Sequence, residues 1–196
     1  MTRPLLITAG ATRNFIDNMR CITANASGKT GAHVAFSCPE NTTLLGSPSA
    51  LLHLKVKILA GKNNPSTINT QEFSSTSDLH QKMKTWLLMH PTGIVVHSAA
   101  VGDYAPQMMT GKIPSGKEHL SIDLFPTTKI LSQIKMWAPS CSLVSFKAAP
   151  PDTSSEELGN IARTQLKKSS SDLVFANILT QTEHNIQLVF VNEILY

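Results

Sequence analysis

The chain opens with Leu5-Leu6-Ile7-Thr8-Ala9-Gly10-Ala11-Thr12, a short apolar strand that runs into a turn of small residues. A second small-residue turn, Asn25-Ala26-Ser27-Gly28-Lys29-Thr30-Gly31, stands at the mouth of a predicted helix. Such turns leave backbone N–H groups uncovered at a strand end and at the positive end of a helix dipole, where a phosphate can sit. The opening therefore indicates nucleotide or phosphate chemistry.

Short apolar runs recur along the rest of the chain and alternate with amphipathic segments. The predicted strands are 5–9, 94–100, 143–146, 173–176 and 186–191, and the predicted helices are 31–37, 77–89, 128–137 and 155–169. This alternation favours a Rossmann-like, doubly wound α/β fold, with a mostly parallel sheet and helices on both faces. The length of 196 residues suits a single domain over 1–196.

Two stretches interrupt the alternation. Residues 39–75 form an irregular excursion rich in Asn, Ser, Thr, Pro and Gly, with plausible strands at 42–45 and 51–56. Residues 105–117 show no period and predict a flexible loop, after which 120–124 alternate as an edge strand does. A loop of this length inside a compact domain is usually functional or disordered.

Composition excludes several classes of protein. No apolar run approaches the ~20 residues of a membrane helix, so no membrane partner is expected. The amino terminus has no apolar leader, and three cysteines at unpatterned spacings fit a reducing compartment, which together predict a cytoplasmic protein. The net charge is +4, but the basic residues are dispersed. A favourable field for an anionic small molecule explains the charge without nucleic acid.

The familiar nucleotide motifs are incomplete. Gly28-Lys29-Thr30 looks like the end of a P-loop, but that motif needs a glycine five positions before Gly28, where Thr23 stands. The turn at 8–12 lacks the G-x-G-x-x-G fingerprint, so a dinucleotide site is poorly supported. Ser27-Gly28 could therefore have no part in phosphate binding and only begin a helix that packs closely on the sheet.

Polar residues follow several other predicted strands. Asp103 comes after the strand at 94–100, and a carboxylate at the carboxyl end of a strand can orient Mg²⁺ bound to phosphates, although it could equally cap a turn. Lys112 is a lone cation on the predicted loop, and its alternative is a solvated lysine. Phe146 and Asn177 close two strands at the same sheet edge, where a backbone group and an amide could bond a base.

Six segments, taken in chain order, carry a resemblance to a known family. They are Thr8-Ala9-Gly10-Ala11-Thr12, Ile16-Asp17-Asn18-Met19-Arg20, Asn25-Ala26-Ser27-Gly28-Lys29-Thr30-Gly31, Ala99-Ala100-Val101-Gly102-Asp103-Tyr104, Lys112-Ile113 and Ala176-Asn177-Ile178-Leu179. Together they resemble the phosphopantothenoylcysteine synthetase family, the ligases of coenzyme A biosynthesis. Residues 137–139 and 145–147 look like the free-standing branch of that family rather than the one fused to a decarboxylase.

The resemblance implies a two-step ligation of 4′-phosphopantothenate to L-cysteine. In the first step the carboxylate attacks the α-phosphate of CTP or ATP and gives an acyl nucleotide, and in the second the amine of cysteine displaces the nucleotide. The carboxylate and the phosphates are all negatively charged, so the reaction needs Mg²⁺, backbone N–H groups and a lysine near the phosphates. Members of the family often complete the substrate site across a dimer, so a homodimer is also expected.

The same resemblance assigns roles to individual residues. Its nucleotide-binding residues would be Gly10, Ala11, Ser27, Gly28, Ala100, Asp103, Phe146 and Asn177, with Asp103 also a metal ligand. Lys112 would close over the phosphates, and Arg20 would support the turn that binds the acyl group. The family asparagine that helps to hold the acyl intermediate aligns with Ala24, so either Asn25 takes that role or the second half-reaction is compromised.

Two other classes of function remain open from the sequence. An NAD(P)-dependent oxidoreductase on this fold would carry a Tyr-x-x-x-Lys pair, but Tyr104 is followed at the fourth position by Met108. A non-catalytic nucleotide-binding or dimerising module is favoured by Ala24. The sequence does not decide between CTP and ATP, because base choice depends mostly on backbone contacts.

Overall fold

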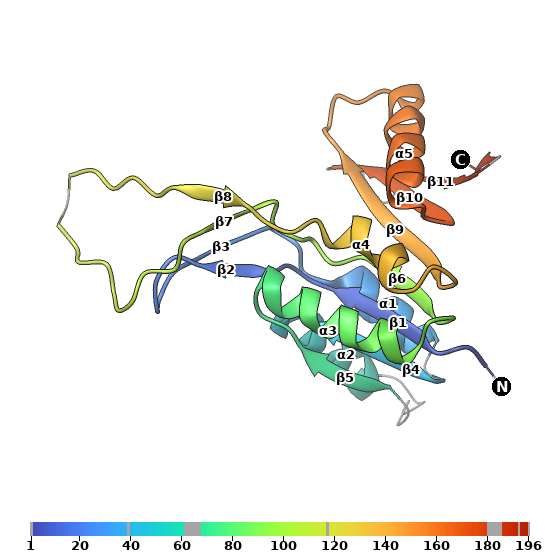
Figure 1. The fold of residues 1–196 in the computed structure, drawn as a ribbon, viewed down its shortest axis with the longest axis horizontal. Coiled ribbons are helices and arrows are strands. Elements are labelled where there is room, and N and C mark those ends of the chain that lie inside the picture. Colours follow the sequence, from blue (N-terminus) through green and yellow to red (C-terminus); the bar gives the residue numbers. More distant parts are fainter. Residues whose placement is uncertain are drawn as a thin grey trace.

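The computed structural model describes residues 2–38, 40–60, 68–116, 118–179, 186–191 and 193–195. At its centre is an eight-stranded sheet in the order β12-β11-β10-β9-β6-β1-β4-β5 (Figure 1). These strands are β1 (Leu5–Ala9), β4 (Thr42–Gly46), β5 (Asn69–Glu72), β6 (Ile94–His97), β9 (Ser142–Ala149), β10 (Leu173–Ile178), β11 (Ile186–Phe190) and β12 (Ile194–Leu195). The strands from β10 to β5 pair in parallel, whereas β11 and β12 join antiparallel.

Helices cover both faces of this sheet. α1 (Lys29–Ser37) and α2 (Pro48–Ala60) pack on one face, and α3 (Thr76–Met89), α4 (Ile130–Trp137) and α5 (Ser155–Ser169) pack on the other. Successive residues of a strand point to opposite faces, so Leu6 is buried under α3 and α4 while Ile7 is buried under α1 and α2. Both faces of β1 are therefore apolar, which explains its unbroken hydrophobic run. The predicted doubly wound α/β fold is confirmed.

The predicted excursion at 39–75 is more regular than expected. The strand predicted at 42–45 is confirmed as β4, but the strand predicted at 51–56 is wrong, because these residues belong to α2. Leu54 of α2 is buried while Leu52 and Val56 are exposed, a helical spacing that the unbroken apolar run concealed. β5 was not predicted, because its four residues are polar and exposed. Residues 39 and 61–67 lie outside the described residues.

Two short antiparallel strand pairs project from the carboxyl side of the sheet and form an arm, residues 13–23, 104–116 and 118–126 (Figure 1). Its strands are β2 (Arg13–Phe15), β3 (Cys21–Thr23), β7 (Tyr104–Pro106) and β8 (Leu124–Pro126). The predicted flexible loop at 105–117 thus begins inside β7. The edge strand predicted at 120–124 is placed too early, since β8 begins at its last residue.

Several predicted boundaries also shift. The strand predicted at 94–100 ends at His97, and Ala100 forms an isolated bridge with Ala11, two residues beyond the end of β1. The helix predicted from residue 128 begins at Ile130, and the helix predicted from residue 31 begins at Lys29. Among the described residues, none of the helices combines the length and the apolar character that crossing a bilayer requires.

Candidate functional site

Two glycine turns meet where β1 ends and α1 begins. Gly10 has φ +90° and Gly28 has φ +78°, both in the left-handed region that favours glycine. A Cβ on Gly28 would lie 2.8 Å from the backbone nitrogen of Gly10, so the turns touch each other. The structure therefore brings Gly10, Ala11, Ser27 and Gly28 together, as the sequence predicts for a phosphate cradle. We call these four residues the cradle.

The amino-terminal end of α1 is open to an anion. Gly28 offers no side-chain cap, and the first turn of α1 holds no acidic residue. By contrast, Ser75 caps α3 and Ser154 caps α5 through their side chains. The exposed Ser27 lies at this same end of the helix. The positive end of the α1 dipole is thus left for a negative charge in the cradle.

Backbone hydrogen bonds fasten the segment after β6 to the cradle. The N–H of Ala100 donates to the carbonyl oxygen of Gly10 at 2.8 Å, and the N–H of Thr12 donates to the carbonyl oxygen of Ala100 at 3.1 Å. The hydroxyl of Thr12 accepts the N–H of Gly102 at 3.0 Å. Ala100, one of the predicted nucleotide-binding residues, therefore lies beside Gly10, and Asp103 follows three residues later.

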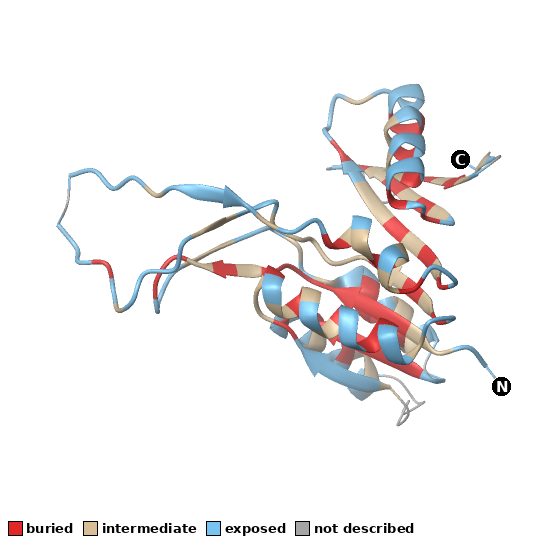
Figure 2. Ribbon diagram, viewed as in Figure 1, coloured by how far each residue is buried: buried red, intermediate tan, exposed pale blue. Residues whose placement is uncertain are grey.

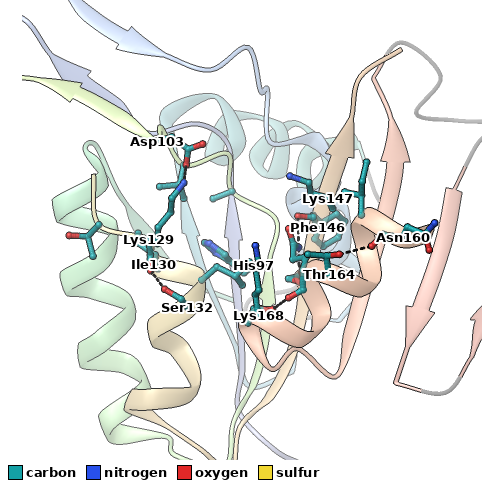
Figure 3. A pocket seen from close by; sticks show the side chains of 18 residues that line it. His97, Asp103, Lys129, Ile130, Ser132, Phe146, Lys147, Asn160, Thr164 and Lys168 are labelled. Atoms are coloured by element: carbon teal, nitrogen blue, oxygen red, sulfur yellow. Dashed lines mark hydrogen bonds and ion pairs between the residues drawn. The ribbon is translucent and has the colours of Figure 1, made fainter. Parts of the chain in front are cut away.

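A cavity of about 780 Å³ opens between α4 and α5, over the carboxyl ends of β6 and β9 (Figure 3). Its charged lining residues are Asp103, Lys129, Lys147 and Lys168. Three cations against one carboxylate favour an anionic ligand. The three lysines were not predicted as site residues, because single lysines on separate elements form no motif. The predicted residues Asp103 and Phe146 both line this cavity.

The side chains of Phe146 and Asn177, the predicted base-binding edge, lie on the same face of the sheet, on the neighbouring strands β9 and β10. The carbonyl oxygen of Phe146 accepts a hydrogen bond from Gln165 of α5 at 3.1 Å, and its ring stacks on Phe175 at 4.9 Å. Ala176 packs in the core beneath α5, so Asn177, the next residue of β10, lies on the opposite face. Asn177 does not line the cavity, which the structure places on the α5 side.

Asp103 is the predicted metal ligand, and its carboxylate is engaged by a lysine. Nζ of Lys129 lies 2.5 Å from Oδ1 of Asp103, and both side chains are exposed. The described part of the chain holds no cluster of three or more His, Cys, Asp or Glu side chains that could bind a metal. Mg²⁺ at nucleotide sites commonly takes one or two carboxylates and completes its shell with phosphates and water. Asp103 fits such a shared ion and does not fit an all-protein site.

His97 lies at the floor of the cavity and was not predicted as a site residue (Figure 3). Its Nδ1 lies 2.7 Å from Oγ1 of Thr8, and that hydroxyl accepts the N–H of Ala99 at 3.2 Å. The Thr8 hydroxyl is then free to donate its proton to Nδ1, which assigns the ring proton to Nε2. Burial lowers the pKa of His97 to about 4, so the ring is neutral at pH 7.

The buried His97 should make the stability of the fold depend on pH. The unfolded chain binds a proton at this ring near pH 6.5 and the folded chain only near pH 4, so the free energy of unfolding falls as the pH drops through this interval. We expect a loss of about 2 kcal/mol between pH 7 and pH 5. Urea unfolding at both values measures it. Between pH 7 and pH 5 the His97→Asn variant should lose less unfolding free energy than the wild type, by about this amount. An equal loss in both proteins would contradict the lowered pKa of His97.

The three predicted catalytic residues lie away from the cavity wall. Lys112 and Arg20 are both on the arm, and Asn25 is exposed in the loop between β3 and α1. Arg20 and the Lys112 loop are in contact, since Nη1 of Arg20 donates to the carbonyl oxygen of Ile113 at 3.4 Å. Within one chain, the structure brings Arg20 to the loop of Lys112 but brings neither residue to the lining of the cavity.

Comparison with known families identifies the family to which the chain belongs. The profile of the DNA/pantothenate metabolism flavoprotein C-terminal domain matches residues 1–192. The chain belongs to this family. The family predicted from the six sequence segments is thereby confirmed. The DNA/pantothenate metabolism flavoprotein C-terminal domain accounts for nearly the whole chain, the irregular stretch at 39–75 included.

Curated relatives in this family are longer than the chain. The coenzyme A biosynthesis bifunctional protein CoaBC of Thermococcus kodakarensis is 36% identical over 177 residues, which make up 89% of the chain and 41% of the relative. The protein of the same name from Methanocaldococcus jannaschii is 26% identical over 178 residues, 90% of the chain and 41% of the relative. The chain thus spans about two fifths of the length of these relatives.

Solved structures share the fold. The DNA/pantothenate metabolism flavoprotein from Streptococcus pneumoniae superposes with a TM-score of 0.82 at 26% identity, over 99% of this chain and 91% of that one. A Cab2 variant in complex with phosphopantothenate-cysteine superposes with a TM-score of 0.77, over 98% of this chain and 79% of that one. Its identity is 18%, so this second likeness shows the fold alone.

Proposed function

We propose that the chain is a phosphopantothenate–cysteine ligase that uses CTP or ATP and acts in coenzyme A biosynthesis. The observation that carries the proposal is the cradle, open at the positive end of α1, together with a cavity between α4 and α5 that three lysines line. The names of the curated relatives support it, since CoaBC is a coenzyme A biosynthesis protein.

The proposed reaction has two displacement steps. The carboxylate of 4′-phosphopantothenate attacks the α-phosphate of the nucleotide, forming a C–O–P bond and releasing pyrophosphate. The amine of L-cysteine then attacks the acyl carbon, forms the amide bond and releases the nucleoside monophosphate with loss of a proton. Both steps bring anions together, so the main task of the protein is to hold them in reacting geometry and to offset their charge.

We assign these functions to residues of the cradle and of the cavity. The backbone N–H groups of the cradle would hold phosphate oxygens, and Lys129, Lys147 and Lys168 would offset the negative charge in the cavity. Asp103 is the carboxylate available to a Mg²⁺ ion that accompanies the triphosphate, which would neutralise phosphate charge. We assign the nucleotide base to the side of the cavity where Phe146 lies, whose carbonyl oxygen already accepts a hydrogen bond from Gln165.

The proposal includes a homodimer formed through the arm. Tyr104, Met108, Leu124 and Phe125 of the arm are large apolar residues with 44–57% of their surface exposed. Apolar side chains gathered on a projecting element are typical of an interaction surface. In a dimer, the arm of one chain would carry Lys112 toward the cavity of the other. This arrangement would account for the distance between Lys112 and the cavity within one chain.

The remaining expectations concern location and other partners. We place the protein in the cytoplasm, with small-molecule substrates and without a nucleic-acid or membrane partner. The described cysteines Cys21, Cys38 and Cys141 are all free, which supports a reducing compartment. The second candidate function is a non-catalytic nucleotide-binding module. Ala24 favours it, because the family ligases carry an asparagine there.

Pyrophosphate release tests the proposed function against this second candidate. The purified chain is incubated with 4′-phosphopantothenate and either CTP or ATP, first without and then with L-cysteine. We expect release up to about one equivalent per site without cysteine, and continued turnover with it. Release without an amide product would place the defect in the second step, at Ala24. No release with either nucleotide would favour the binding module. The rates with CTP and ATP identify the preferred nucleotide.

A further inference from the structure

The residue after Lys112 is held by both of its backbone polar groups. The N–H of Ile113 donates to Oδ2 of Asp17 at 3.0 Å. The carbonyl oxygen of Ile113 accepts from Nη1 of Arg20 at 3.4 Å. Asp17 and Arg20 are themselves joined, with 2.6 Å between Oδ2 and Nη1. One ion pair therefore holds both backbone polar groups of Ile113, which is more than ninety residues away in the sequence.

The carboxylate of Asp17 is buried and fully engaged. Its side chain has no exposed surface. Oδ1 accepts the backbone N–H groups of Met19 at 2.7 Å and Arg20 at 2.8 Å, which forms the tight turn between β2 and β3. Several backbone hydrogen bonds lower the pKa of Asp17 to about 2, and the bond from the N–H of Ile113 has the largest effect. Asp17 is thus ionised at neutral pH and holds two segments of the arm at once.

Further contacts lay the Lys112 loop along this turn. The N–H of Asn18 donates to the carbonyl oxygen of Gly111 at 3.1 Å, and the N–H of Met109 donates to that of Ile16 at 2.8 Å. Ile113 is 7% exposed and Ile16 is 8% exposed, although the arm around them is largely exposed (Figure 2). The backbone is therefore held on both sides of Lys112, while the Lys112 side chain itself is exposed.

We propose that the Asp17–Arg20 ion pair positions Lys112 by clamping Ile113, so that the lysine is presented from a fixed backbone. We call this arrangement the clamp. The inference rests on the proposed function for the role of Lys112, and it adds Asp17 as a positioning residue. A turn that needed only its own hydrogen bonds would use Oδ1 of Asp17 alone. Oδ2 of Asp17 and the Arg20 guanidinium bind each other within the turn, and each also bonds the backbone of Ile113 in a distant loop.

The variant Asp17→Asn separates these two tasks. An asparagine that keeps the turn through its Oδ1 places an NH₂ group opposite the N–H of Ile113 and the guanidinium of Arg20. Donors then face donors, so the clamp is lost while the turn is retained. Asp152→Asn is the matched control, because Asp152 is an exposed carboxylate in the turn before α5.

The rate at which trypsin cuts after Lys112 measures how firmly the clamp holds Ile113. Trypsin cuts after Lys112 only when the peptide bond to Ile113 can leave its present contacts. We expect Asp17→Asn to speed this cut by about tenfold or more, because the local opening is no longer opposed by the clamp. Asp152→Asn should cut at the wild-type rate, and cuts at Lys55 and Lys57 in α2 report any global unfolding. An unchanged rate at Lys112 in Asp17→Asn would overturn the proposal.

A double-mutant cycle then connects the clamp to the reaction. Asp17→Asn should lower kcat about tenfold with a smaller change in KM, since misplacement of a reacting group costs rate rather than affinity. In a Lys112→Ala background the same change should cost nothing further. Equal losses in both backgrounds would show that Asp17 acts apart from Lys112 and would overturn the positioning role. A chain with no ligase activity would refute the proposed function, and the trypsin result would still decide whether the clamp exists.

Discussion

Lys112→Ala should lower the turnover of the proposed ligase reaction by at least ~100-fold, by analogy with the loss of one preorganised charge that stabilises a transition state. The backbone around Lys112 is fixed by hydrogen bonds, so the alanine variant removes the ammonium group without releasing the loop. The rate of pyrophosphate release at saturating nucleotide measures the effect. Lys55→Ala, on the exposed side of α2, is the control and should keep the wild-type rate. An unchanged rate in Lys112→Ala would remove this residue from the site.

The same variant tests whether Lys112 serves the cavity of a second chain. Lys112→Ala and Asp103→Ala chains are each expected to be inactive as homodimers. In a mixed dimer, one cavity would have its own Asp103 together with the Lys112 of its partner. Co-expression should then restore about a quarter of the wild-type sites, because half of the dimers are mixed and each has one intact site. No recovery would indicate that Lys112 acts within its own chain or that no such dimer forms.

Gly10→Ala should destabilise the fold by about 3 kcal/mol or more, through both conformation and overlap. Gly10 has φ +90°, and its new Cβ would lie 1.8 Å from Oγ of Ser47. The neighbouring backbone would have to move, which would also displace the cradle. Urea unfolding at pH 7 measures the loss.

Gly116→Ala is the matched control for this prediction. Gly116 has φ +96°, but a Cβ there would meet nothing within 4 Å. It should therefore cost only the conformational part, about 1 kcal/mol. Similar losses in the two variants would show that packing around Gly10 relaxes easily, and the cradle would then be less rigid than its contacts indicate.

The parts of the fold that the sequence predicted correctly are those where burial determines the pattern. β1, β6 and β10 are apolar runs because the sheet is covered on both faces, and α5 begins at a capping box between Ser154 and Glu157. The strand predicted at 51–56 failed for the same reason, since a dense apolar run in α2 resembles a buried strand. β5 has no apolar residue and therefore gave no signal.

The candidate site was predictable only where local geometry requires a residue type. Gly10 and Gly28 need left-handed backbone, so their turns are visible in the sequence. Lys129, Lys147 and Lys168 meet only because α4, β9 and α5 pack around one cavity. The bond between Asp17 and Ile113 joins residues that no local pattern connects. Tertiary contacts of this kind carry no spacing that a single sequence could reveal.

The strand order has a consequence for the protein while it is being made. β1 pairs with β4 on one side and with β6 on the other. Leu5 pairs with Ile94, so the second edge of β1 cannot form its hydrogen bonds until Ile94 has been synthesised. At translation speeds of about 5–20 residues per second, one edge of this apolar strand stays without its partner for roughly 4–18 seconds. Nascent chains would therefore expose an aggregation-prone edge on the ribosome. Holdase chaperones should matter more for the yield of this protein than for its final stability.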